Sequence, residues 1–171
     1  DAGACAAPRA HSSYVPSNRS MQEQYMRRAI ELAQDAVRAG GSPYGTVIAD
    51  PRIARIVAEG RNNASVDPIW HGEMSAITNL SDIRGDVYAI AGDLELYTTA
   101  EPCPMCMSTI VWSGFAAVYY GTSIPYLIEC GRRQINLRAV DAAAQTVGNF
   151  TNTTVVGGVL KAECDALYPL P

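Results

Sequence analysis

Four side chains in two short stretches have the types and spacing of a catalytic metal site. His71 and Glu73 stand two positions apart, and Cys103 and Cys106 lie within Pro102-Cys103-Pro104-Met105-Cys106. A catalytic zinc has three protein ligands and keeps its fourth tetrahedral position open for water. One imidazole and two thiolates supply these three ligands, and the two-residue gap between the cysteines lets both sulfurs reach one ion from the first turn of a helix. We therefore predict that His71, Cys103 and Cys106 bind zinc.

Glu73 is the candidate for acid–base chemistry at this site. It stands too close to His71 to be a comfortable fourth ligand, but its carboxylate can reach water at the metal. Zinc lowers the pKa of such a water to about 7, and a neighbouring carboxylate can take the released proton and return it later in the reaction. A closed structural zinc site or a redox pair is the alternative interpretation of C-x-x-C. Neither alternative needs Glu73, and a structural zinc would require a fourth ligand.

These residues, in the order H-x-E…P-C-x-x-C, resemble the signature of zinc-dependent nucleobase deaminases. The whole chain resembles the cytidine deaminase-like superfamily, in the branch of bacterial tRNA adenosine deaminase, guanine deaminase and fungal cytosine deaminase. Besides His71-Gly72-Glu73, the segments that carry this resemblance are Gly60-Arg61-Asn62, Asp67-Pro68, Thr98 to Cys106 and Gly158-Val159-Leu160 to Glu163-Cys164. The resemblance implies hydrolytic deamination of an aminated nucleobase, nucleoside or similar small heterocycle, with Glu73 as proton shuttle and release of ammonia.

The resemblance also implies several contacts with the substrate. Asn62 matches a family asparagine that contacts the base, and Tyr44 stands where relatives have a residue that lines the pocket. In this family the backbone around Ala100 and Glu101 offers groups to the base and to the departing amine. The alternatives are a turn-forming asparagine, a strand tyrosine in the core, and a glutamate that caps the following helix.

Two positions depart from the family pattern. Trp70 replaces the small residue that usually precedes the ligand histidine, and we expect it at the edge of the pocket, with packing away from the pocket as the alternative. Ile124-Pro125-Tyr126 stands where guanine deaminase has an acidic residue, which argues against guanine as the substrate. The sequence therefore leaves the identity of the base or nucleoside open.

Length and composition predict one domain that acts on a small molecule. The chain has 171 residues, of which 48% are hydrophobic and 18% charged, and these values are ordinary for a globular domain. Its net charge is −4 and its single lysine is Lys161, so the sequence lacks the clustered positive charge of a nucleic-acid surface. The candidates for such a surface, Arg61, Arg132 and Arg133, are few, and we expect the last two in an exposed loop. No apolar run approaches the length of a membrane span.

We expect a homodimer, because the relatives that the chain resembles form dimers whose interface lies near the active site. The apolar residues of one predicted helix exceed what a single buried face needs; they are Met105, Met107, Ile110, Val111 and Trp112. A deaminase of tRNA or other nucleic acid is the alternative function, and an inactive zinc-binding structural or binding module is the alternative from another class. Glu73 argues against the inactive module, which has no need of a proton shuttle.

Three cysteines, Cys5, Cys130 and Cys164, remain outside the predicted zinc site. They are ordinary thiols or, as the alternative, Cys130 and Cys164 form a disulfide, which would imply an oxidising compartment. Five of the seven asparagines begin glycosylation sequons; they are Asn18, Asn63, Asn79, Asn149 and Asn152. Residues 1–7 are mostly small, as at the start of a mature chain after signal removal. These features favour a secreted, extracellular protein over a cytoplasmic one.

Apolar periodicity and turn residues predict alternating helices and strands after an N-terminal arm or tail over residues 1–20. The deaminase domain then spans residues 21–171. Helices are expected over 21–39, 71–80, 103–112, 135–144 and 161–167, and strands over 44–50, 53–59, 93–98, 115–120 and 153–156. Ser20 caps the first helix together with Glu23, and residues 121–131 are expected to be irregular. This order predicts a three-layer α/β/α sandwich around a five-stranded mixed sheet, with two helices starting at the metal.

Overall fold

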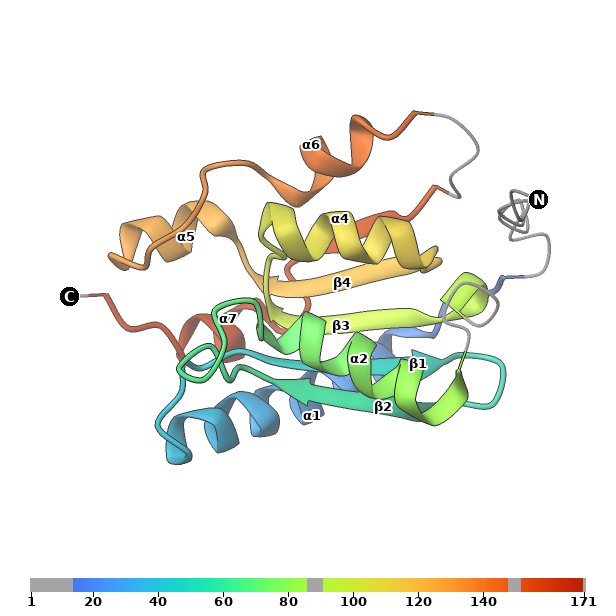
Figure 1. The fold of residues 1–171 in the computed structure, drawn as a ribbon, viewed down its shortest axis with the longest axis horizontal. Coiled ribbons are helices and arrows are strands. Elements are labelled where there is room, and N and C mark those ends of the chain that lie inside the picture. Colours follow the sequence, from blue (N-terminus) through green and yellow to red (C-terminus); the bar gives the residue numbers. More distant parts are fainter. Residues whose placement is uncertain (1–13, 86–90, 148–151, 171) are drawn as a thin grey trace.

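A five-stranded mixed sheet lies at the centre of the protein (Figure 1). The computed structural model describes residues 14–85, 91–147 and 152–170. The strands are β1 (Gly45–Asp50), β2 (Arg55–Arg61), β3 (Glu95–Ala100), β4 (Ala117–Thr122) and β5 (Thr154–Gly157). Their order across the sheet is β2-β1-β3-β4-β5. Strand β1 is antiparallel to β2 and β3, whereas β3, β4 and β5 are parallel.

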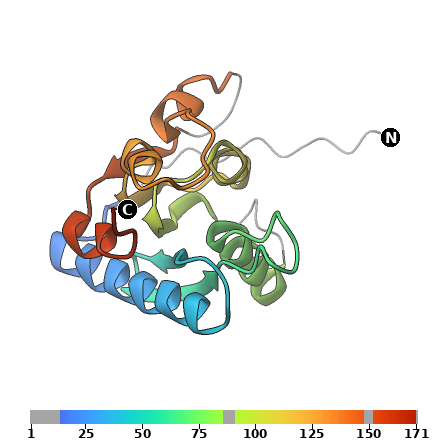
Figure 2. The same cartoon turned by 90° about the vertical axis from the view of Figure 1, so that its left-hand side faces the viewer.

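Helices cover both faces of this sheet, as the end view in Figure 2 shows. They are α1 (Arg19–Arg38), α2 (Gly72–Arg84), α4 (Pro104–Ser113), α5 (Ile124–Glu129), α6 (Ala139–Ala144) and α7 (Lys161–Asp165), with a 3-10 turn at Ala91–Asp93. Helices α1 and α7 lie on one face, and α2 and α4 lie on the other. The predicted three-layer sandwich with a five-stranded mixed sheet is therefore confirmed.

Burial on both faces explains why the central strands show no alternation of polar and apolar residues. Every residue of β1, β3 and β4 is buried, as expected for strands that are covered by helices on both sides. Leu80 and Ile110 belong to the core under α2 and α4. Met26 and Tyr97 belong to the core under α1. The sheet thus lies between two apolar layers.

Helix α1 begins earlier than the sequence pattern predicts. Asn18, and not Ser20, is its N-cap, and the Asn18 side chain accepts a hydrogen bond from the Met21 amide. Asparagine and serine are comparable caps, and the spacing from Ser20 to Glu23 favoured serine. The Glu23 carboxylate instead accepts a hydrogen bond from Arg19 at 3.0 Å, so the predicted capping box does not form.

The segment from Tyr14 to Asn18 belongs to the folded domain, although it was predicted as part of an arm. The Tyr14 hydroxyl and the Ser17 amide donate to one carboxylate oxygen of Glu95, at 2.6 and 2.9 Å. Glu95 is completely buried, and its other oxygen accepts a hydrogen bond from Tyr97. The predicted arm therefore ends before residue 14, and residues 1–13 lie outside the described part of the chain.

Residues 121–131 are regular, contrary to the sequence prediction. Strand β4 continues to Thr122, and helix α5 follows it directly. Ser123 is the N-cap of α5, its hydroxyl accepts a hydrogen bond from the Tyr126 amide, and Pro125 lies in the first turn. A serine N-cap and a proline in the first turn are both standard signals of a helix start. The sequence of the helix, IPYLIE, is rich in isoleucine, proline and tyrosine, whose low helix propensity hid it.

The cysteines outside the predicted zinc site are buried thiols where the structure describes them. The Cys130 thiol donates to the Tyr168 carbonyl oxygen at 3.0 Å, and the Cys164 thiol lies 3.8 Å from the Val159 carbonyl oxygen. Both are free, so the alternative of a Cys130–Cys164 disulfide is wrong. Cys5 lies outside the described residues. None of the helices in the described part of the chain has the length and apolar character needed to cross a membrane.

Candidate active site

The predicted metal ligands and Glu73 lie at the N-termini of helices α2 and α4. His71 is the N-cap of α2, and Cys103 is the N-cap of α4, both with extended backbone. Gly72 allows α2 to begin close to β1, because a Cβ atom there would lie 2.9 Å from Thr46 Oγ1 and 3.3 Å from the Tyr44 carbonyl oxygen. Pro104 opens α4, where its missing amide proton costs no helical hydrogen bond. Both helix N-termini therefore face one point.

The three predicted ligands meet at that point. His71 Nδ1 lies 3.6 Å from Cys103 Sγ and 3.6 Å from Cys106 Sγ. A tetrahedral zinc about 2.3 Å from each sulfur and about 2.1 Å from the nitrogen would separate nitrogen from sulfur by about 3.6 Å. All three ligand atoms lie within 4.8 Å of one another. The residues therefore fit a zinc ion bound through His71 Nδ1 and the two thiolates, with the fourth position left to a non-protein ligand.

The electrostatics of this cluster favour a bound cation. Hydrogen bonds from the Cys106 thiol and from His71 lower the pKa of Cys103 to about 4, against the opposing effect of burial. The hydrogen bond to Cys103, followed by burial, raises the pKa of Cys106 well above its usual value. The pKa of His71 is raised chiefly by its hydrogen bond to Cys103. One thiolate thus forms readily, and the partial positive charge of the helix N-terminus supports it.

Glu73 lies in the first turn of α2, beside the ligands but outside the ligand cluster. The residue is buried, with 6% of its surface exposed. Burial, and next the charge of Cys103, raise the pKa of the Glu73 carboxyl. A buried carboxyl with a raised pKa holds a proton more readily than an exposed one and can return it. Its place and environment suit a proton carrier.

Asn62 and Tyr44 are hydrogen-bonded to each other, and the Tyr44 carbonyl oxygen lies close to Gly72, the residue between His71 and Glu73. The Asn62 amide donates to the Tyr44 carbonyl oxygen at 2.9 Å. Asn62 Oδ1 accepts hydrogen bonds from the amides of Ser42 and Ala64, at 3.4 and 3.3 Å. These two donors fix the orientation of the side-chain amide, and Asn62 Nδ2 has no partner among the described residues. The contact of Asn62 with a substrate stays a prediction.

The family follows from the match between this site and known sequences. Residues 19–122 match the model of the family described as the cytidine and deoxycytidylate deaminase zinc-binding region. The matched stretch contains His71, Glu73, Cys103 and Cys106. The chain belongs to this family. The predicted superfamily and zinc as its metal are thereby confirmed, and the protein is a hydrolytic deaminase.

The relatives of this deaminase carry names that refer to different substrates. Guanine deaminase of Bacillus subtilis (strain 168) is 39% identical over 112 residues, which cover 64% of this chain and 69% of the relative. A probable cytosine deaminase of Schizosaccharomyces pombe (strain 972 / ATCC 24843) is 33% identical over 127 residues, 70% of this chain and 76% of the relative. A solved structure from a study of A-to-I editing by tRNA:A34 deaminases has a TM-score of 0.69 at 23% identity. It covers 84% of this chain and 98% of that one, which shows a shared fold.

Glu101 has a structural role in this deaminase, and the expected contact of its backbone with the substrate stays a prediction. Its amide donates to the Thr122 carbonyl oxygen, and its side chain is completely buried. The carboxylate accepts hydrogen bonds from the amides of Ile124 and Ala139 and from Arg138 Nε, at 2.8 to 2.9 Å. Glu101 therefore caps α5 and α6 and not, as the alternative had it, the helix that follows it directly. Long-range pairing of this kind has no local sequence signal.

The remaining predicted contacts lie near the site but differ in exposure. Ala100 is buried at the end of β3 and packs in one cluster with Leu127 and Tyr168. Trp70 is 43% exposed in the loop before α2, where its backbone pairs with Asn63 and Asp67. Its place at the edge of the pocket stays a prediction. Tyr168 was not predicted at all, because an isolated tyrosine near the C-terminus resembles any buried core residue.

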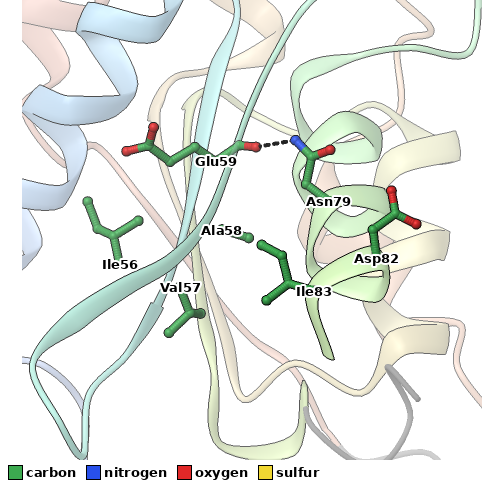
Figure 3. Close-up of a pocket in the computed structure, with 7 residues that line it drawn as sticks. All are labelled: Ile56, Val57, Ala58, Glu59, Asn79, Asp82 and Ile83. Carbon is green, nitrogen blue, oxygen red and sulfur yellow. Dashed lines mark hydrogen bonds between the residues drawn. The ribbon is translucent and has the colours of Figure 1, made fainter. Parts of the chain in front are cut away.

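A separate hollow of about 520 Å³ lies between the edge strand β2 and helix α2 (Figure 3). Its lining residues are Ile56, Val57, Ala58, Glu59, Asn79, Asp82 and Ile83, none of which is a predicted site residue. Asn79 Nδ2 donates to the Glu59 carbonyl oxygen at 2.8 Å and so ties α2 to the outer edge of the sheet. This nitrogen is also the atom that glycosylation of the Asn79 sequon would modify.

Proposed function

We propose that this deaminase is zinc-dependent and removes the amino group of a small aminated heterocycle, either a free base or a nucleoside. The observation that carries the proposal is the position of Glu73, a buried carboxyl beside a three-ligand cluster that leaves one metal position open. A structural zinc site has four protein ligands and no use for such a carboxyl. The same feature opposes an inactive binding module.

The residues of the site suit one hydrolytic reaction. Bound zinc supplies a nucleophile at neutral pH, because it lowers the pKa of water to about 7. Glu73 takes a proton from the attacking water and delivers it to the ring nitrogen beside the attacked carbon. It then helps to protonate the amine, which leaves as ammonia when the carbon–nitrogen bond breaks. Asn62 Nδ2 donates to a carbonyl oxygen of the ring, and Tyr44 bounds the ring on one side.

A small substrate is favoured over a nucleic acid by charge. The net charge of the chain is −4, and charge attraction beyond about 8 Å is screened at physiological salt. Of the three arginines that could form a groove, Arg61 is exposed and donates to the Asp35 carbonyl oxygen. Two relatives are named for the free bases guanine and cytosine, which supports a base, whereas one structural relative comes from a study of tRNA deaminases.

We also propose that the deaminase is a homodimer. Met107 and Ile110 of α4 are buried in the protein's own core, so they do not contribute to an interface. Trp112, at the end of the same helix, is 60% exposed, and Val140 of the neighbouring helix α6 is also exposed. An exposed tryptophan with apolar neighbours is typical of protein interfaces. This surface of α4 and α6 is our candidate for the dimer contact.

An assay of ammonia release by the zinc-loaded protein tests the substrate class. The panel contains cytosine, adenine and guanine, their nucleosides, single-stranded DNA and a tRNA stem-loop, with protein carrying Glu73→Gln as the blank. We expect turnover of at least one base or nucleoside and little or none of the polymers. Efficient editing of an oligonucleotide while free bases remain untouched would instead support the nucleic-acid deaminase.

A further inference from the structure

A buried carboxylate stands at each end of strand β3. Glu95 is the first residue of the strand, and Glu101 follows its last residue, Ala100. Both are buried, with at most 3% of their surface exposed. A buried charge is costly unless hydrogen bonds satisfy it, so each carboxylate needs donors around it. Of the two, Glu101 alone stands next to a predicted zinc ligand, since Cys103 is two positions further along the chain.

The Glu101 carboxylate joins the starts of two helices that are separate in the sequence. One oxygen accepts a hydrogen bond from the Ile124 amide at the start of α5, and the other accepts one from the Ala139 amide at the start of α6, both at 2.8 Å. Arg138 Nε lies 2.9 Å from both oxygens, and its Nη2 donates to the Tyr120 hydroxyl at 3.0 Å. The ligand cluster found among the described residues does not include this carboxylate.

Helix α5 is itself fixed to the C-terminal part of the chain. Leu127 in the helix is completely buried, and the Cys130 thiol donates to the Tyr168 carbonyl oxygen at 3.0 Å. Arg132 is half-buried, with its guanidinium carbon 5.9 Å from the centroid of the Tyr168 ring, whereas Arg133 is exposed. The expectation that both arginines lie in an exposed loop is therefore wrong for Arg132. The carboxylate is thus bonded to an element that has firm contacts of its own.

The connection from β3 to α4 is short, so the position of Glu101 constrains that of Cys103. It runs from Glu101 to Cys103, with Pro102 between them. The proline ring fixes one backbone angle of this connection. The Glu101 amide donates to the Thr122 carbonyl oxygen at 2.7 Å, so the main chain and the side chain of Glu101 are both held. The Cys103 thiolate therefore has less freedom to lose when a metal binds.

We propose that Glu101 is a positioning residue that prepares the Cys103 thiolate for zinc binding. The proposal rests on the zinc-dependent deaminase function above and gives its metal site a support from outside the ligand set. The effect is indirect, because the carboxylate holds the backbone and the backbone holds the sulfur. Substitution of residues that orient metal ligands in this way typically costs about 10- to 100-fold in metal affinity or activity.

The zinc affinity of Glu101→Gln, measured by competition with a chromogenic chelator, tests the proposal without an assay of deamination. The amide keeps the shape of the side chain, but it replaces one acceptor oxygen by a donor that faces a backbone amide. We expect a zinc dissociation constant at least about tenfold above that of the unaltered protein. When cobalt is bound in place of zinc, the visible absorption that reports tetrahedral thiolate coordination should weaken.

Glu95→Gln is the matched control, because it alters a carboxylate that is equally buried and lies on the same strand. Glu95 accepts hydrogen bonds from the Tyr14 hydroxyl at 2.6 Å, the Ser17 amide at 2.9 Å and the Tyr97 hydroxyl at 2.7 Å. It lies at the end of β3 that is remote from the zinc ligands. The substitution should lower the free energy of unfolding, as Glu101→Gln does, but it should leave the zinc dissociation constant unchanged.

Two results would overturn the proposal. An unchanged zinc dissociation constant in folded Glu101→Gln, or an equal rise in Glu95→Gln, would show that Glu101 only stabilises the fold. If Glu101→Gln does not fold, Arg138→Met decides, because it removes the guanidinium and keeps the two amide contacts. It should raise the constant by a smaller factor, and no rise would refute the role of Glu101. If no compound is deaminated, the proposed function fails, while metal binding still decides the proposal about Glu101.

Discussion

At the scale of single residues, Glu73 shows how one position can serve two opposing demands. Its place in the first turn of α2 favours the negative form, since helix N-termini carry partial positive charge. Its burial favours the neutral form, and burial is the larger effect, so the pKa of the carboxyl is raised. A carboxyl balanced in this way can accept a proton and give it up within one reaction cycle.

Glu73→Gln should therefore abolish deamination without removing the metal. Glutamine has the same shape but cannot carry the proton, and the loss should be at least about 100-fold in kcat. Metal analysis should still find one zinc per chain, because Glu73 is not part of the ligand cluster. Near-normal turnover by this variant would contradict the assigned role.

Asn62→Asp tests the substrate contact with a minimal change. Aspartate keeps the oxygen that accepts the Ser42 and Ala64 amides, but it replaces the free Nδ2 donor by a second acceptor. A ring carbonyl would then face an oxygen, so kcat/KM should fall by about 10- to 100-fold. Asn63→Asp, one position further along the loop, is the matched control and should have little effect. A similar loss in both variants would indicate a general effect on the loop.

At the scale of elements, the turn between β1 and β2 depends on a carboxylate. Asp50 accepts hydrogen bonds from Arg52 Nε at 2.9 Å, Arg52 Nη2 at 2.7 Å and the Arg52 amide at 3.0 Å. These bonds lower the pKa of Asp50 below its usual value, although burial opposes them. The ionised Asp50 carboxylate thus stabilises the folded protein fully at pH values above about 3.9, the pKa of aspartate in an unfolded chain. This stability is lost as the pH falls through the lower folded value.

Asp50→Asn should accordingly lower the free energy of unfolding at pH 7 by about 1 kcal/mol, a modest value because Arg52 is largely exposed. The difference from the unaltered protein should shrink as the pH falls below about 4. Chemical denaturation at several pH values measures both. Asp93→Asn removes the weaker contact of the same Arg52, at 3.2 Å, and should cost less. A pH-independent difference for Asp50→Asn would exclude the proposed linkage.

At the scale of the whole molecule, the surface of α4 and α6 is the candidate contact of the proposed homodimer. The exposed Trp112 and Val140 lie on packed neighbouring helices, and α4 begins at the zinc ligands. We expect a homodimer by sedimentation at micromolar concentration, with at least about 1,000 Å² buried, as a specific interface requires. Trp112→Arg should yield monomers. Ile53→Arg, at the exposed turn between β1 and β2, is the control and should leave the dimer intact.

The sequence by itself determined the metal site and the sheet architecture. His71 and Glu73 lie in one local motif and Cys103 and Cys106 in another, so residue spacing encodes the placement within each motif. His71 and Cys103 are 32 positions apart, and the fold brings the two motifs together. Strands and longer helices were predicted because their apolar residues repeat over several turns. The short helix α5 was missed because its sequence, IPYLIE, is rich in isoleucine, proline and tyrosine, which have lower helix propensity than the alanines of the equally short α6.

Only the tertiary structure decided how distant segments meet. Glu101 caps two helices that begin 23 and 38 residues later, and Tyr168 donates to Pro43 across 125 positions. Cys130 and Cys164 proved to be separate thiols, although their number allowed a pair. Arg132 lies over Tyr168 because the end of α5 and the C-terminal segment pack together. Such contacts depend on how the whole chain packs, and no local spacing of residues encodes them.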